Sequence, residues 1–173
     1  MYINFWYPVI LSEELKDEPV RVRMLGQNFV TFRDSKGAPK TLSDTCVHRG
    51  GSLSGGVVRD DCIQCPYHGW RFDGEGECKR IPSLGKDAKI PKRTRIDAYP
   101  TEEKYGIVFA FLGDLEKSKR PPIMPIAELD DEENWRANWL NYEAKINFER
   151  SIENGLDAAH NEFVHPTHGH EGE

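Results

Sequence analysis

Two short pairs of cysteine and histidine are the residues of this sequence with the clearest chemical potential. Cys46 and His48 form a Cys-x-His pair, Cys65 and His68 form a Cys-x-x-His pair, and sixteen residues lie between the two pairs. Two cysteines and two histidines are the donors of a tetrahedral zinc site. They are also the donors of a [2Fe–2S] cluster in which two cysteines hold one iron and two histidines hold the other. The spacing alone does not distinguish these two kinds of site.

The residues that follow each pair favour the cluster. Arg-Gly-Gly follows His48, and Gly-Trp follows His68. Glycine lets the backbone come close enough to a cluster for its N–H groups to bond the sulfides. Tyr67 and Trp70 add an aromatic wall and hydrogen-bond donors, which suit a redox centre and which a zinc ribbon does not need.

A second group of polar residues lies near the end of the chain. Asn154, Asp157 and His160 are three residues apart, so that on a helix they share one stripe. His165 follows five residues later and can turn back toward the same point. Two converging imidazoles suit a non-haem Fe(II) centre, which takes two histidines and one carboxylate and leaves positions open for O₂ and substrate. Asp157 lies one turn before His160, a placement that suits orienting the histidine ring better than binding the iron.

The remaining cysteines and histidines are given no metal. Cys62 is expected to be a strand residue and Cys78 a free thiol near a loop. His168 and His170 are expected to lie in a solvated tail. In a cytosolic chain, cysteines are more often thiols or metal ligands than disulfides.

The first 112 residues have the pattern of short strands separated by turns. The runs rich in β-branched and aromatic residues are Phe5–Ile10, Val20–Leu25, Phe29–Arg33, Val57–Val58, Ile63–Gln64, Trp70–Phe72 and Ile107–Phe111. Turn sequences such as Asp-Ser-Lys-Gly at 34–37 lie between them. Many short strands at close spacing predict an antiparallel barrel or sandwich.

The composition changes after residue 112. Residues 113–134 are predicted to be a charged, proline-rich linker followed by an acidic surface segment. The alternation in Trp135–Tyr142 predicts a strand, and the apolar spacing over 146–159 predicts a helix that cannot continue through Pro166. We therefore expect a complete β domain at 1–112, the linker, and the start of a second domain at 135–173.

The charge of the chain excludes some classes of partner. The formal net charge is −6 and no basic run is present, so neither nucleic acid nor an anionic membrane is an expected partner. No stretch approaches the roughly 18 consecutive apolar residues of a membrane span. The first residues show no basic region before an apolar run, hence no signal peptide, and the cytoplasm is the expected compartment.

The two Cys/His loops resemble those of a known family. Cys46-Val-His48-Arg-Gly and Cys65-Pro-Tyr-His68-Gly-Trp-Arg-Phe are similar to the cluster loops of Rieske non-haem iron oxygenases, the alpha subunits that hydroxylate or demethylate organic compounds. Respiratory Rieske proteins carry an extra cysteine in each loop, where this sequence has Gly and Tyr. The segment Arg-Ile-Pro-Ser at 80–83 resembles the family's third, proline-containing loop. The opening Asn-Phe-Trp-Tyr-Pro-Val at 4–9 also resembles the start of these oxygenases.

The resemblance implies a role for each site residue. The cluster ligands would be Cys46, His48, Cys65 and His68, with Trp70 and Pro82 around them. The mononuclear Fe(II) would be bound by His160 and His165, with Asn154 beside them. Asp157 resembles the residue that bridges this iron site to a cluster histidine, His68 of the partner subunit. The family's third iron ligand is a carboxylate much later in the chain, which the present 173 residues do not include.

The resemblance also implies a fold and an activity. The fold would be mainly β, a Rieske-type antiparallel β domain followed by the start of an α+β, helix-grip-like catalytic domain. The activity would be that of an oxygenase component, which takes electrons from a ferredoxin or flavin reductase and uses O₂ to hydroxylate or oxidatively demethylate a small organic substrate of the aromatic type. A homo-oligomer, usually a trimer, is implied because the two centres of one subunit are far apart in this family. The monooxygenase and demethylase branch fits better than the dioxygenases with a separate small subunit.

Three other interpretations stay open at this point. A Rieske-type, ferredoxin-like electron-transfer protein is the first, although it should end near Gly113 and should lack the segment with His160 and His165. A zinc-binding structural module is the second, and it predicts a colourless protein. An incomplete piece of a longer enzyme is the third, and it predicts a chain that binds the cluster without oxygenase activity.

Overall fold

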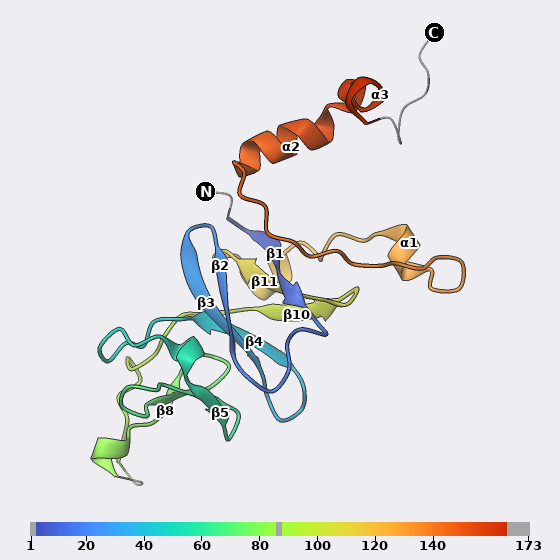
Figure 1. Ribbon diagram of the computed structural model, residues 1–173. Coiled ribbons are helices and arrows are strands. Elements are labelled where there is room, and N and C mark those ends of the chain that lie inside the picture. The colour runs from blue at the N-terminus through green and yellow to red at the C-terminus, as the bar shows by residue number, and fades with distance from the viewer. Residues whose placement is uncertain (1–2, 86–87, 166–173) are drawn as a thin grey trace. The chain divides into compact units, whose positions relative to one another are not determined.

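Three antiparallel sheets make up the first part of the chain (Figure 1). In the computed structural model, which describes residues 3–85 and 88–165, the first sheet has the order β1–β11–β10. Its strands are β1 (Phe5–Leu11), β11 (Ile107–Leu112) and β10 (Thr101–Lys104). The second sheet comprises, in order, β2 (Val20–Met24), β3 (Gln27–Arg33), β4 (Pro39–Ser43) and β9 (Ala98–Tyr99). The third comprises, in order, β5 (Val57–Arg59), β6 (Cys62–Gln64), β7 (Arg71–Phe72) and β8 (Cys78–Arg80).

The mainly β, antiparallel fold is therefore confirmed, and all seven strands predicted in the first 112 residues are present with ends shifted by at most two residues. The sequence does not predict β4, β8, β9 and β10. β4 begins with a proline and is largely polar, but its Thr41 lies opposite Thr31 and the two buried hydroxyls are 3.1 Å apart, within hydrogen-bond distance. Pairing with β3 thus satisfies polar groups that made the segment resemble a loop.

The core beneath the third sheet includes two of the chemically important cysteines. Cys46 and Cys65 belong to one buried apolar cluster with Phe32, Leu42, Leu53, Ile63, Phe72 and others. Each of the apolar members just named is fully buried. Burial of such side chains stabilises each by about 1.5–3 kcal/mol, so the loops that carry the two cysteines are fixed by the packing of the core itself.

One ion pair fastens the second sheet to the first. Arg33 at the end of β3 donates to both carboxylate oxygens of Glu103 in β10, at 2.8 and 3.0 Å. The same guanidinium donates to the main-chain oxygens of Ser12 and Leu15. The hydrogen bond from Arg33 lowers the pKa of Glu103.

Glu103→Gln is expected to lower the free energy of unfolding by about 1 kcal/mol at neutral pH. Because the folded-state pKa of Glu103 is depressed, its contribution is present above the unfolded pKa and is lost as the pH falls through the folded pKa. Urea unfolding of both proteins across a pH series should show the difference fading in acid. Glu102→Gln, at an exposed position of the same strand without an ion pair among the described residues, is the control. A difference that persists unchanged in acid would contradict the assignment.

The segment after β11 is held against the first sheet. Asn4 Oδ1 accepts hydrogen bonds from the main-chain N–H groups of Asp114 and Leu115, at 3.0 and 3.2 Å. The Trp6 indole donates to the main-chain oxygen of Pro121 at 2.7 Å, and Ile123 is buried. The segment continues through η3 (Lys117–Lys119) and ends in the short helix α1 (Ala127–Asp130). The predicted linker is thus anchored along its length within this unit.

The chain divides into two compact units, Met1–Asp131 and Glu132–Glu173. The second unit contains α2 (Phe148–Leu156), η4 (Ala158–His160) and α3 (Asn161–Val164). The strand predicted at Trp135–Tyr142 is wrong, since no strand forms there and all its side chains are exposed. A strand needs a neighbour to receive its N–H and C=O groups, and no described segment of the chain pairs with this one. No helix in residues 3–85 and 88–165 has both the length and the apolar character that crossing a bilayer requires.

Candidate metal centres

The two Cys/His loops are built alike. The N–H of Gly50 donates to the main-chain oxygen of Cys46 at 2.9 Å, and the N–H of Gly69 donates to that of Cys65 at 3.0 Å. Both glycines have φ near +70°, at +69° and +71°. Side chains other than glycine rarely adopt this left-handed conformation, so the glycine after each histidine is what allows the chain to turn back. The sequence predicts these loops correctly because the glycines are part of the motif.

The turns bring the two histidines together. The ring centroids of His48 and His68 are 4.5 Å apart, with an interplanar angle of 69°. Trp70 stacks flat on His48, at 4.5 Å and 3°. The ring of Tyr67 lies 4.0 Å from that of His68. His48 is half-buried and His68 is exposed, so the imidazole pair forms the solvent side of the site.

The two cysteines form the inner side. Cys46 and Cys65 are 2% and 3% exposed, neither is in a disulfide, and the two thiols interact with each other. Burial raises the pKa of Cys46 to about 11, so the metal-free thiol is protonated at neutral pH. A metal that binds the thiolate must release this proton. For His48, desolvation and then the nearby His68 and Arg49 lower the pKa, which favours the neutral imidazole that binds metals.

The donor set fits a two-iron cluster. The four side chains form two pairs, the buried thiols of Cys46 and Cys65 and the facing imidazoles of His48 and His68. A cluster that takes two thiolates at one iron and two imidazoles at the other needs two such pairs. A side chain on Gly51 would place its Cβ 3.2 Å from the Cys65 sulfur and 3.4 Å from the Tyr67 Cβ. The glycine therefore leaves the space beside the sulfur open.

The proline of the third loop lies against the second cysteine loop. Pro82 begins the short helix η2 (Pro82–Leu84), and a Cβ on Gly69 would lie 3.2 Å from its Cγ. Ile81, the residue before it, belongs to the core cluster that contains Cys46 and Cys65. The structure therefore brings together all six residues that the sequence assigns to the cluster and its surroundings.

Gly51→Ala is expected to reduce the amount of cluster that the chain retains, because the new methyl group crowds the Cys65 sulfur. The measurement is iron and sulfide per protein after anaerobic reconstitution. Gly55→Ala is the matched control, since its Cβ meets only Pro66 Cγ at an ordinary 3.8 Å. Equal cluster content in both variants and the parent would show that the space beside Cys65 is not used.

A buried carboxylate anchors the first loop, and sequence reasoning does not find it. Asp44 is 3% exposed and accepts four hydrogen bonds from three residues. The donors to its oxygens are Ser54 N at 2.6 Å, Ser52 Oγ at 2.6 Å, Ser54 Oγ at 2.9 Å and Arg21 Nε at 3.0 Å. In the sequence, only the position of Asp44 two residues before Cys46 suggests a role in the loop. The pairing with Arg21 cannot be read from the sequence, because the two residues are 23 positions apart.

The second candidate site lies in the second unit. Asp157 ends α2 and its carboxylate accepts from the N–H of Ala159 at 3.2 Å, which breaks the helix predicted over 146–159 into α2 and η4. The predicted helix is therefore too long. The break places the rings of His160 and His165 5.3 Å apart. Asn154 lies in the last turn of α2, where its main-chain oxygen accepts from the N–H of Asp157.

Asp157 also meets His160 directly. His160 Nδ1 contacts the main-chain oxygen of Asp157 and lies 3.7 Å from its Oδ2. A donor role for Nδ1 leaves the Nε2 lone pair available for a metal. The structure thus brings His160, His165 and Asp157 together, while His168, His170 and Pro166 lie outside the described residues.

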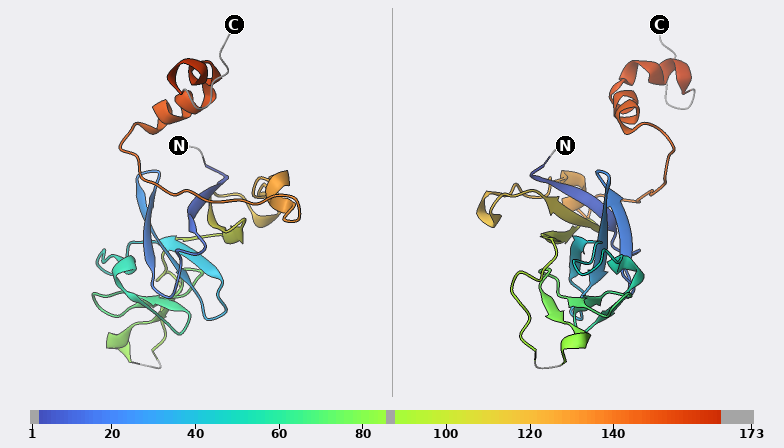
Figure 2. Two further views of the ribbon diagram at one scale, coloured as in Figure 1. Left: turned by 45° about the vertical axis from the view of Figure 1, so that its right-hand side comes forward. Right: turned by 90° about the vertical axis from the view of Figure 1, so that its left-hand side faces the viewer.

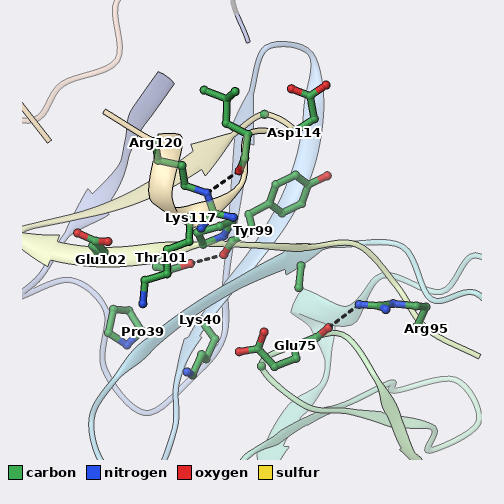
Figure 3. A pocket seen from close by; sticks show the side chains of 15 residues that line it. Pro39, Lys40, Glu75, Arg95, Tyr99, Thr101, Glu102, Asp114, Lys117 and Arg120 are labelled. Carbon is green, nitrogen blue, oxygen red and sulfur yellow. Dashed lines mark hydrogen bonds between the residues drawn. The ribbon is translucent and has the colours of Figure 1, made fainter. Parts of the chain in front are cut away.

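A pocket of about 510 Å³ lies in the first unit, and none of the candidate site residues lines it (Figure 3). Its charged lining consists of Lys40, Arg95, Lys117 and Arg120 with Glu75, Glu102 and Asp114. Arg120 and Arg95 donate to the main-chain oxygens of Leu115 and Glu75. Because acidic and basic groups nearly balance, the pocket shows no preference for an ion of one sign.

Comparisons with known proteins identify the same family that the two Cys/His loops resemble. Residues 5–100 match the family model described as the Rieske [2Fe–2S] domain. The alpha subunit of phenoxybenzoate dioxygenase from Ectopseudomonas oleovorans is 42% identical over 122 residues, which cover 70% of this chain and 29% of that protein. The 4beta-methylsterol monooxygenase of Methylococcus capsulatus is 36% identical over 164 residues, which cover 94% of this chain and 44% of that protein.

Solved structures give the same result. NdmA of Pseudomonas putida CBB5 is 30% identical with a TM-score of 0.81, over 94% of this chain and 50% of that one. Dicamba monooxygenase, in a crystal structure with non-haem iron and dicamba, is 30% identical with a TM-score of 0.62, over 69% of this chain and 37% of that one. The chain spans half or less of the length of each of these relatives. It belongs to the Rieske [2Fe–2S] domain family, in the branch of the oxygenase alpha subunits.

Proposed function

We propose that this chain is part of an oxygenase component that hydroxylates or oxidatively demethylates a small organic substrate with O₂. The observation that carries the proposal is the pairing of two buried cysteines with two adjacent histidine rings on matching loops. Cys46, Cys65, His48 and His68 would hold the Rieske cluster, and His160 and His165 would hold a mononuclear Fe(II). When bound, the cluster supplies single electrons and the iron supplies the activation of O₂.

The chain's own residues position these groups. The two cysteines lie in the core, whereas the histidines lie at the surface, so electrons would enter and leave on the imidazole side. Trp70 stacks on His48 and fixes the orientation of its ring. The glycine turns fix the direction of both loops without side chains that would crowd the cluster.

Asp157 is proposed to connect the two kinds of site between subunits. Its side chain is 58% exposed while it lies beside His160, so it can reach a second imidazole from outside. That imidazole would be His68 of the partner subunit, in a homo-oligomer such as a trimer. A ferredoxin or flavin reductase would be the electron donor, and the free thiols of all four cysteines suit the cytoplasm.

Spectroscopy of the reconstituted chain tests the proposal. Loaded anaerobically with iron and sulfide, the chain is expected to be brown and, once reduced, to show an EPR signal with the low average g-value of a Rieske cluster. Fe(II) should bind in addition, and His160→Ala with His165→Ala should remove that second binding while leaving the cluster spectrum intact. A colourless chain that takes up one zinc ion would contradict the proposal.

A further inference from the structure

A single charged side chain is buried in the described part of the chain, and it lies beside the first cluster loop. Among residues 3–85 and 88–165, Asp44 is the only Asp, Glu, Lys, Arg or His that is buried. It stands two residues before Cys46, so the Cα atoms of the two residues are at most about 7 Å apart. Desolvation opposes the burial of a charge even when the charge is paired. The hydrogen bonds that hold the loop need an acceptor only, so the charge of Asp44 is a separate feature of this position.

Arg21 is the counter-ion of this carboxylate. Its Nε donates to Asp44 Oδ2 at 3.0 Å and to Ser54 Oγ at 3.1 Å. Arg21 of β2 and Leu42 of β4 both lie opposite Val30 of β3, which puts the three side chains on one face of the second sheet. Asp44 directly follows β4, so the guanidinium reaches it along this face. The Arg21 side chain is 54% exposed and that of Asp44 is 2% exposed, so water screens the cation more than the anion.

The ion pair lies at the base of the first cluster loop. The main-chain oxygen of Asp44 accepts from the N–H of Leu53 at 3.0 Å, at the start of the short helix η1 (Leu53–Gly55). Inside the loop, the N–H of Cys46 donates to the main-chain oxygen of Gly51 at 2.9 Å. Both views in Figure 2 show the segment that runs from β4 to η1, in cyan and teal, beside β2 and β3. The loop is therefore closed on itself, and the charge of Asp44 has a fixed position relative to Cys46.

The second cluster loop has no buried carboxylate at the corresponding place. Gln64, which directly precedes Cys65, is neutral, and its Oε1 accepts from Arg71 Nε at 2.9 Å. Arg71 forms an ion pair with Asp60, but the Asp60 side chain is 85% exposed and its charge is screened by water. The two loops thus share their glycine turns and differ in their charges. The strongest fixed charge near either loop is the one on Asp44, because it alone is shielded from solvent.

We propose that the ion pair of Arg21 and Asp44 sets the reduction potential of the cluster that the two loops hold, an inference that rests on the proposed function. Reduction adds one negative charge to the site, so the carboxylate opposes it and the guanidinium favours it. A unit charge on the order of 10 Å from a redox centre shifts a one-electron equilibrium by about tenfold when the effective dielectric constant is about 20. Asp44 lowers the potential, and Arg21 cancels part of this effect, with a smaller weight because it is half exposed.

The midpoint potentials of two variants test the pair. Asp44→Asn removes the anion but keeps an acceptor for the N–H of Ser54, and it is expected to raise the equilibrium constant for reduction about tenfold, which is about 59 mV. Arg21→Gln leaves the carboxylate without its counter-ion and should lower the same constant about threefold, which is about 28 mV. The double variant should lie between the two. The anaerobically reconstituted chain is titrated at neutral pH in a spectroelectrochemical cell, in which the electrode supplies the electron and the visible absorbance reports the fraction reduced.

Arg23→Gln is the matched control, because it removes the same charge from an exposed side chain of the same strand that has no ion pair among the described residues. Its potential should stay close to that of the parent. Loosening of the loop would shift both single variants in the same direction, so shifts of the same sign would overturn the proposal. Parental potentials in both variants, or an equal shift in Arg23→Gln, would also overturn it. If Asp44→Asn assembles no cluster, the sign of the Arg21→Gln shift decides. A parent chain that assembles no cluster would instead reject the proposed function.

Discussion

Cys65→Ser is expected to abolish the cluster, with a loss of at least about tenfold in bound iron and sulfide after reconstitution. One iron of the proposed cluster depends on the thiolates of Cys46 and Cys65 alone, so losing one leaves that iron with a single protein sulfur. The visible absorbance and the low-g EPR signal of the reduced protein should disappear together. The measurement is iron, sulfide and spectra on protein whose folding has been verified by circular dichroism.

Cys62→Ser is the matched control, and it discriminates between kinds of metal site. Cys62 is 6% exposed and lies in β6, three residues before Cys65, so a serine there also buries a hydroxyl group close to the second cysteine loop. The cluster assignment predicts full cluster content for Cys62→Ser and equally for Cys78→Ser, at a position that is 7% exposed. A zinc site built on the Cys-x-x-Cys pair 62/65 predicts metal loss in both Cys62→Ser and Cys65→Ser, an outcome that would falsify the present ligand set.

The cluster loops could be predicted from the sequence because their chemistry is local. In each loop the cysteine, histidine and glycine lie within five residues, and the glycine turn that shapes the loop needs no distant partner. The assignment of the ligands stays a prediction, but the sequence does predict that His48 and His68 lie close together, as they do in the structure.

The features that the sequence misses depend on distant pairing. Polar β4 becomes a strand because β3 lies beside it, and Trp135–Tyr142, which has a strand-like alternation, forms none because no described segment pairs with it. The helix predicted over 146–159 is interrupted at Asp157. The carboxylate of this residue accepts a hydrogen bond from the N–H of Ala159 and so caps the start of η4. Periodicity reports which face is apolar, whereas caps and sheet neighbours decide where an element ends.

The distribution of charge over the surface also depends on distant pairing and cannot be predicted from the net charge. A net charge of −6 argues against polyanionic partners when it is taken over the whole chain. The fold, however, neutralises Lys79 with Asp73 and Glu77 and leaves Arg80, Lys92 and Arg93 unpaired within the described residues, next to the cluster loops. The local field at a surface therefore depends on which charges the fold pairs, and the net charge of the chain does not report it.

Asp44→Ala is expected to be the most destabilising single substitution near the cluster, lowering the free energy of unfolding by about 3 kcal/mol. Removing the buried carboxylate leaves three donors of Ser52 and Ser54 without their acceptor, at about 1 kcal/mol each. Arg21 adds little to this loss because its side chain is 54% exposed and water can replace the carboxylate. Urea unfolding at neutral pH, followed by tryptophan fluorescence, measures the change.

Two further variants distinguish the loss of the hydrogen bonds that Asp44 accepts from the loop and the loss of an ion pair at the surface. Asp44→Asn keeps an oxygen for the N–H of Ser54 and is expected to cost less than half as much. Asp60→Asn removes the charge of the exposed Asp60 carboxylate (85% exposed), which pairs with Arg71. Asparagine tolerates the positive φ of this position, so the variant should leave stability almost unchanged. The donors of the loop that begins at Cys46 point to the Asp44 carboxylate, so Asp44→Ala should also lower cluster content after reconstitution, whereas Asp60→Asn should not. Parental stability and cluster content in Asp44→Ala would mean that the packing of Leu53 and its neighbours, and not the carboxylate network, holds the first cluster loop in place.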